Sequence, residues 1–119
     1  MSRDHLLFLR DIERSCEKIV HHTAGRSRDE ALADELRFDG ILFNLHVIGE
    51  AVKNLPLELR HKYSDVAWRE IAGLRDFIAH AYFALDLDIL WDAVQRDIPA
   101  LLERVRQILN VEEEAPPPG

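Results

Sequence analysis

Apolar residues recur every three or four positions along most of this chain, which is the spacing of one face of an α-helix. The first such run follows Ser2 and Asp4, two residues that suit a helix start, and it ends near Ala24. Its apolar or small positions are Leu9, Ile12, Cys16, Ile19, Val20 and Thr23. The pattern predicts one amphipathic helix at the beginning of the chain.

A second, longer helix is predicted from Arg28 to Leu55. Gly25 interrupts the first pattern, and the sequence Ser27-Arg-Asp-Glu30 then forms a capping box, a common helix start. Spacings of three and four alternate along a seam made of Phe38, Ile41, Leu45, Ile48, Val52 and Leu55. We expect a bend at Gly40 and a close contact with another helix at Gly49, because glycine has no side chain.

The second half of the chain predicts three further helical segments. A short helix spans Leu57 to Tyr63, and the next one is capped by Ser64 or Asp65. It buries one side through Trp68, Ile71, Ala72 and Ile78. The last helix starts from caps within residues 84–88 and continues past Pro99, where we expect a kink because proline lacks an N–H group. Its seam consists of Leu87, Trp91, Val94, Ile98, Leu101, Val105 and Ile108.

These elements together predict an all-α fold. The sequence has no alternating β pattern, no repeat and no glycine-rich phosphate loop, so we expect an antiparallel bundle of four main helices plus a short helix. Residues 1–110 form this domain, and residues 111–119, rich in Glu and Pro, are expected to be a disordered tail. The long apolar seams leave apolar surface for a partner, which makes a homodimer plausible.

Composition limits where the protein acts and what it binds. The chain has 119 residues, 47% of them hydrophobic, enough for one domain. A lone Cys16 allows no internal disulfide and suits a cytoplasmic protein, and neither a signal peptide nor a membrane span is expected. The net charge of −7 argues against binding nucleic acid by charge alone. An RNA substrate would therefore depend on local basic groups, namely Arg60, Lys62, Arg69 and Arg75.

The candidate chemistry is concentrated between Trp68 and Leu85, where Arg75, Asp76, His80 and Tyr82 stand among apolar residues. On one helix these four side chains form two neighbouring rows, so they can line one edge of a cleft. A carboxylate one turn before an imidazole can fix its tautomer, and a guanidinium fork matches a phosphate. The combination suits acid–base chemistry on a phosphodiester. The alternative is structural: such residues also cap helix carbonyls, pair with each other and face water.

The spacing Arg75-x4-His80-x-Tyr82 resembles the R-x4-H-x-Y motif of the HepT-like toxins, a branch of the HEPN superfamily. The flanking sequence, from about Leu6 to Leu109, is also similar to that family. The matching segments are Ile48-Gly-Glu-Ala51, Trp68, Gly73-Leu-Arg75, Tyr82-Phe83, Ile89-Leu-Trp91 and Asp97-Ile-Pro99. An ordered set of this kind is more specific than the motif alone.

The resemblance implies a HEPN-like helical fold and an endoribonuclease that works as a dimer without a metal or another cofactor. It assigns Arg75 and His80 as the catalytic pair, with Asp76 orienting His80, and it implies cleavage of RNA to 2′,3′-cyclic phosphates. Tyr82 matches the tyrosine that a minimal nucleotidyltransferase antitoxin, of the MntA type, adenylylates to silence the toxin. An adenylyl group beside Arg75 would neutralise the guanidinium and obstruct the cleft.

Two other classes of function remain open from the sequence. The domain could be a non-catalytic nucleotide-binding or docking subunit of a nucleotidyltransferase complex, or a structural bundle in which the motif only stabilises a dimer. A metal enzyme is the weaker reading. His46 and Glu50 lie at i and i+4 and could share an ion, but two ligands without a third favour a surface or interface pair.

Overall fold

The computed structural model describes residues 4–75 and 87–114, and all regular secondary structure in these two ranges is helical. This confirms the predicted all-α class. The elements are α1 (Asp4–Thr23), α2 (Arg28–Ala33), α3 (Glu35–Asn54), α4 (Leu57–Lys62), α5 (Trp68–Ala72), α7 (Leu87–Asp92), the π-helical segment η1 (Ala93–Asp97) and α8 (Ile98–Glu114).

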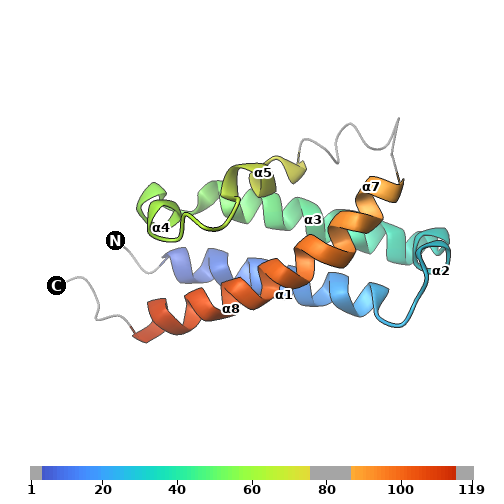
Figure 1. Cartoon of the computed structure of the whole chain (residues 1–119), viewed down its shortest axis with the longest axis horizontal. Helices are drawn as coiled ribbons and strands as arrows, with labels where there is room; N and C mark the ends of the chain where they lie inside the picture. Colours follow the sequence, from blue (N-terminus) through green and yellow to red (C-terminus); the bar gives the residue numbers. More distant parts are fainter. Residues whose placement is uncertain (1–3, 76–86, 115–119) are drawn as a thin grey trace.

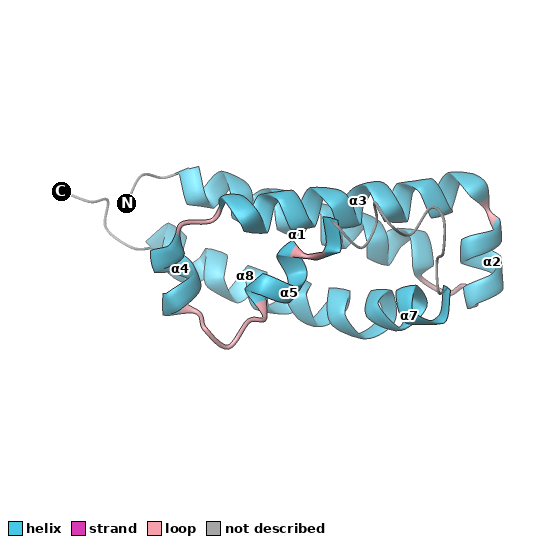
Figure 2. Cartoon of the chain, turned by 90° about the horizontal axis from the view of Figure 1, so that it is seen from above, coloured by secondary structure: helices cyan, strands magenta, loops and turns pink. Residues whose placement is uncertain are grey.

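Three long helices, α1, α3 and α8, lie side by side and form the body of the molecule (Figure 1). Helix α1 runs from one end to the other, and α3 and α8 each run back along it, so both are antiparallel to α1. Helix α5 lies against α3, and α4 follows the C-terminal end of α3 (Figure 2). No helix within the described ranges is long and apolar enough to cross a lipid bilayer.

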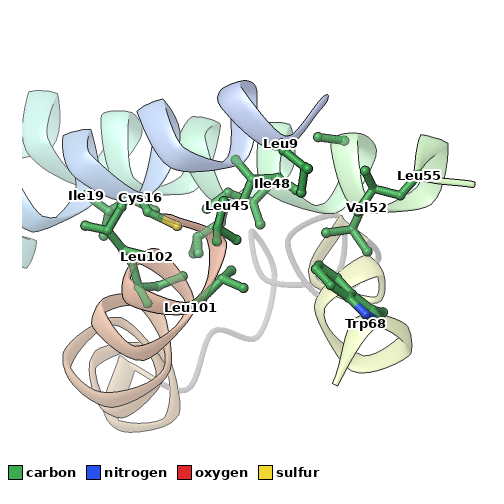
Figure 3. Packing of buried hydrophobic residues seen from close by; sticks show 14 of the residues in the cluster. Leu9, Cys16, Ile19, Leu45, Ile48, Val52, Leu55, Trp68, Leu101 and Leu102 are labelled. Atoms are coloured by element: carbon green, nitrogen blue, oxygen red, sulfur yellow. The ribbon is translucent and has the colours of Figure 1, made fainter. Parts of the chain in front are cut away.

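The core is formed where the predicted seams of these helices meet (Figure 3). The buried seam residues are Leu9, Ile12, Cys16 and Ile19 of α1, Ile41, Leu45, Ile48 and Val52 of α3, and Ile98, Leu101, Val105 and Ile108 of α8. Burying apolar side chains of this size stabilises the fold by about 1.5–3 kcal/mol each relative to leaving them exposed. Cys16 is fully buried among them, as the sequence predicts.

The predicted helix from Arg28 to Leu55 is interrupted, so its continuity is corrected. Asp34 takes an extended conformation, with φ −78° and ψ 108°, and its carboxylate accepts hydrogen bonds from the backbone N–H groups of Leu36 and Arg37. It therefore starts α3 as a separate helix. The interruption lies at Asp34 rather than at Gly40, through which α3 continues. The predicted capping box of Ser27 and Glu30 is confirmed at the start of α2.

The last helix changes its hydrogen-bonding pattern just before Pro99. The backbone N–H of Ile98 bonds to the carbonyl of Ala93, five residues earlier, in the π-helical segment η1. Proline has no N–H group and its ring crowds the carbonyl of the preceding turn, so regular α-helical bonding is disturbed there. The sequence predicts a kink at Pro99, and the structure has the π-helical segment η1 just before this residue.

Helix α8 continues to Glu114, four residues beyond the predicted end of the helical domain at residue 110. Residues 111–114 are helical, although the sequence assigns them to a disordered tail. Glu112 is only 6% exposed, and its carboxylate accepts hydrogen bonds from the Tyr63 hydroxyl at 2.6 Å and the Lys62 ammonium at 2.8 Å. His5 of α1 lies 3.4 Å from the same carboxylate. Three partners from distant segments therefore hold the end of the helix in place.

Candidate active site around Arg75

The segment that carries the candidate motif is anchored by Trp68, the first residue of α5. The Trp68 side chain is 5% exposed and lies beside Val52 at one end of the core (Figure 3). Its indole Nε1 donates a hydrogen bond to the Tyr63 carbonyl at 3.0 Å, so both its apolar and its polar parts are satisfied. This anchor places the short helix α5 against α3.

The expected cap of this helix is corrected. The N-cap of α5 is Ala67, which makes no side-chain cap hydrogen bond, rather than Ser64 or Asp65. The Asp65 carboxylate instead accepts two hydrogen bonds from Arg104 of α8, at 2.7 and 3.1 Å. The two bonds tie the loop before α5 to α8, and the Arg104 guanidinium holds the pKa of Asp65 below its ordinary value. Asp65 thus acts between helices rather than within one.

Gly49 of α3 makes the predicted close helix contact, and its neighbour is the backbone of Arg75. A Cβ atom at Gly49 would lie 3.1 Å from the Arg75 nitrogen and 3.3 Å from the Ala72 carbonyl oxygen. Both distances are shorter than ordinary van der Waals contacts of a Cβ atom. The absence of a side chain at Gly49 therefore lets the backbone at Arg75 lie directly against α3.

The Arg75 side chain forms an ion pair with Glu50, the residue that follows Gly49. Nη1 of Arg75 donates a hydrogen bond to Oε1 of Glu50, and the two side chains are 36% and 38% exposed. This hydrogen bond holds the pKa of the Glu50 carboxyl below its ordinary value, although partial burial opposes the effect. The Glu50 carboxylate therefore stays ionised and binds one edge of the Arg75 guanidinium.

The ion pair between Glu50 and Arg75 also concerns the alternative that His46 and Glu50 share a metal ion. The sequence predicts a surface or interface pair of His46 and Glu50; in the structure His46 is exposed, and Glu50 forms an ion pair with Arg75. Among residues 4–75 and 87–114, no three His, Cys, Asp or Glu side chains lie close enough together to hold a metal ion. The described side chains at this site thus offer a guanidinium–carboxylate pair.

The other three predicted site residues, Asp76, His80 and Tyr82, lie outside the described residues, as does Ile78. Helix α5 ends at Ala72, Gly73 forms a turn, and Leu74 and Arg75 are again helical. The structure thus places the beginning of the motif.

A cavity of about 540 Å³ lies beside α5, between the loop before it and the η1–α8 segment. Its lining is mainly apolar, and charged groups of Asp65, Glu70, Asp97 and Arg104 also border it. Leu74 lines the cavity, and the next residue is Arg75. The sequence alone did not indicate this space, because its lining comes from α3, the loop before α5, α5, η1 and α8, which periodicity treats separately.

Two of the basic residues expected to attract RNA have structural partners. Arg60 Nη2 donates hydrogen bonds to the carbonyls of Val52 and Lys53, at 2.7 and 3.0 Å, and so caps the C-terminal end of α3. Lys62 binds the buried Glu112 carboxylate. Arg69 is exposed on α5. Arg60 and Lys62 thus use part of their positive charge in contacts within the fold.

Comparison with known proteins places these features in a family. The family model described as "Ribonuclease HepT-like" matches residues 12–108, which include part of α1, the whole of α3 and α5, part of α8 and the whole R-x4-H-x-Y motif. None of the solved structures compared with this chain matches it. The evidence for the family therefore comes from sequence, and it agrees with the all-helical fold.

Named relatives cover most of the chain. A "Putative RNase" of Caldanaerobacter subterraneus subsp. tengcongensis is 39% identical over 88% of this chain and 94% of its own length. The "Probable ribonuclease HepT" of Thermococcus cleftensis is 37% identical over 85% of this chain and 92% of its own length. A Methanocaldococcus jannaschii protein named "Gamma-glutamylcyclotransferase and putative RNase" is 36% identical over 92% of this chain, which spans 50% of that protein. With the family model and the two relatives that match over more than nine-tenths of their own length, the chain belongs to the HepT-like ribonuclease family.

Proposed function

We propose that this HepT-like ribonuclease is the toxin of a toxin–antitoxin pair and cleaves RNA without a metal ion. The proposal is supported by the family match together with one structural observation: the backbone and guanidinium of Arg75 are held against α3 by Gly49 and Glu50. An arginine held in place in this way can meet a phosphate without a large loss of side-chain entropy. Arg75 and His80 are the proposed catalytic residues. The helical part of the chain is proposed to form one HepT-like domain, and the tail follows it.

The proposed reaction uses these two side chains on one phosphodiester. His80 takes the proton from a ribose 2′-hydroxyl, the 2′-oxygen attacks phosphorus, the bond to the 5′-oxygen breaks, and the leaving 5′-oxygen takes up a proton from water. Arg75 stabilises the charge that develops on the non-bridging oxygens. The products are a 2′,3′-cyclic phosphate and a 5′-hydroxyl, so DNA is not a substrate. Asp76 is the proposed partner that orients His80.

Regulation is proposed to act on Tyr82. A nucleotidyltransferase antitoxin would transfer AMP from ATP to the tyrosine hydroxyl and release pyrophosphate. The new phosphate would lie two residues from His80 in sequence and would compete with RNA for Arg75. A homodimer and a cytoplasmic location belong to the same proposal. The dimer would bring two copies of the motif to one cleft and raise the local positive charge in a chain whose net charge is −7.

The test is RNA cleavage in the presence of a metal chelator, with analysis of the 3′ ends. The parent protein should yield cyclic phosphates, whereas Arg75→Ala and His80→Ala variants of unchanged helicity should lose activity. Intact RNA with all three proteins would call for mass spectrometry of Tyr82, since adenylylated protein is expected to be silent. Inactive parent protein without the modification would overturn the proposal in favour of a non-catalytic docking subunit.

A further inference from the structure

The Glu50 carboxylate approaches the candidate site from a different helix than the motif. Glu50 belongs to α3, while Arg75 follows α5, and 25 positions separate them in the sequence. Helix α3 is held by its buried face, where Ile48 and Val52 are fully buried on either side of Glu50 in sequence. The backbone at Glu50 therefore cannot move independently of the core. The partner that binds the Glu50 carboxylate is thus attached to a rigid part of the fold.

Two contacts from neighbouring residues of α3 act on Arg75 together. Gly49 permits the close approach of the Arg75 backbone, and Glu50 binds the Arg75 guanidinium at Nη1. A long, flexible side chain held at both ends has few remaining rotamers. We propose that Glu50 is a positioning residue that orients Arg75 toward the scissile phosphate, a role that rests on the ribonuclease function proposed above.

The chemistry of the pair is compatible with phosphate binding. A guanidinium carries five N–H donors in a rigid fork, so an ion pair at Nη1 and a contact with a phosphate are not mutually exclusive. The carboxylate also has a cost, because a negative charge beside the site repels the RNA backbone. Glu50 thus orients the arginine but weakens the affinity for RNA. Its removal should therefore lower kcat without raising KM.

The first experiment measures the pair itself and needs no RNA. The side-chain carboxyl of Glu50 is titrated by NMR in the parent protein and in Arg75→Gln. We expect the pKa of Glu50 to be below its ordinary value in the parent and to rise in the variant, because the charged donor is lost. Equal pKa values in the two proteins would show that the ion pair does not exist in solution, and the proposal would be overturned.

The second experiment separates kcat from KM for RNA cleavage. In Glu50→Ala we expect kcat to fall on the order of 10-fold, because Arg75 loses its orientation, while KM stays equal or falls, because a repulsive charge is removed. Glu50→Gln should recover part of kcat, since its amide oxygen can still accept a hydrogen bond from Arg75. Any decrease in KM should disappear at high salt.

A matched control is Glu58→Gln on the exposed start of α4, which makes the same charge change outside the Glu50–Arg75 pair. It should leave kcat unchanged. An unchanged kcat in Glu50→Ala, or a loss in Glu50→Ala accompanied by a higher KM, would overturn the positioning role. Failure of parent protein without an adenylyl group on Tyr82 to cleave RNA would instead contradict the ribonuclease function, and the NMR titration would still decide whether Glu50 holds Arg75.

Discussion

The backbone nitrogen of Arg75 lies so close to Gly49 that a Cβ atom there would be only 3.1 Å away. The contact joins the middle of α3 to the first residue of the candidate motif. It explains physically why a glycine stands beside the apolar seam at this position: any side chain would push the two segments apart. The neighbours are two backbone atoms and the Cβ of Arg75, which cannot rotate away as the end of a side chain can.

Substitution of this glycine should therefore be harmful, although alanine favours a helix. Gly49→Ala gains up to about 1 kcal/mol of helix propensity but crowds the backbone, and overpacking costs about 1–3 kcal/mol. We expect a net loss of about 1 kcal/mol in the free energy of unfolding, measured by urea denaturation, and reduced RNA cleavage.

Gly40→Ala is the matched control on the same helix. Its Cβ would meet the end of the His22 side chain, 2.7 Å from Nε2, and this ring can turn away. We expect Gly40→Ala to be neutral or stabilising. Equal destabilisation by both alanines would contradict the claim that the close backbone contact sets the effect at Gly49.

The buried carboxylate of Glu112 should make stability depend on pH. Burial disfavours its charged form, but hydrogen bonds from Lys62 and Tyr63 outweigh burial and hold the pKa below the ordinary value of 4.5. A lowered pKa in the folded state contributes stability above the unfolded value, and that contribution is lost as pH falls through the folded value. We expect the free energy of unfolding to decrease below about pH 4.5 more steeply in the parent than in Glu112→Gln.

At neutral pH, Glu112→Gln itself should cost about 1–3 kcal/mol, because charged hydrogen bonds to a buried group are replaced by weaker ones. Glu114→Gln, an exposed substitution on the same helix, should cost less than about 0.5 kcal/mol. Chemical denaturation at several pH values measures both effects. Parallel pH curves for the parent and Glu112→Gln would contradict the assignment.

Truncation should distinguish the end of the domain from the tail. A chain that ends at residue 110 loses Glu112 and its bonds to Tyr63 and Lys62, so we expect a lower melting temperature. A chain that ends at Glu114 keeps these bonds and should melt like the full chain. Thermal unfolding followed by circular dichroism measures the difference. If the chain that ends at residue 110 melted like the full chain, the domain would end at residue 110, as composition predicts.

The single thiol should be unreactive in the folded protein. Cys16 is fully buried, and burial raises the pKa of its thiol to about 12, so little thiolate forms at neutral pH. Labelling with a thiol reagent should be slow in buffer and fast in denaturant, and its rate in buffer should follow global unfolding. Rapid labelling of native protein would contradict the position of Cys16 in the core.

Much of the fold was predictable because apolar periodicity reports burial directly. The seams of α1, α3 and α8 are buried as their spacing indicates, and the capping box at Ser27 has its expected geometry. Local chemistry was less reliable where a long-range partner competes: Asp65 could have capped α5, but it binds Arg104 of α8. The break before α3 falls at Asp34, a local cap, rather than at a glycine.

The sequence by itself determined the helical class, the buried faces and the family, because these depend on spacing and on an ordered motif. The catalytic roles of Arg75 and His80 remain a proposal drawn from that motif. Only the tertiary structure decided that Glu50 meets Arg75, that Gly49 lets them approach, and that Glu112 is buried. These contacts join residues far apart in the chain, and periodicity along one helix contains no information about which residue of another helix will face it.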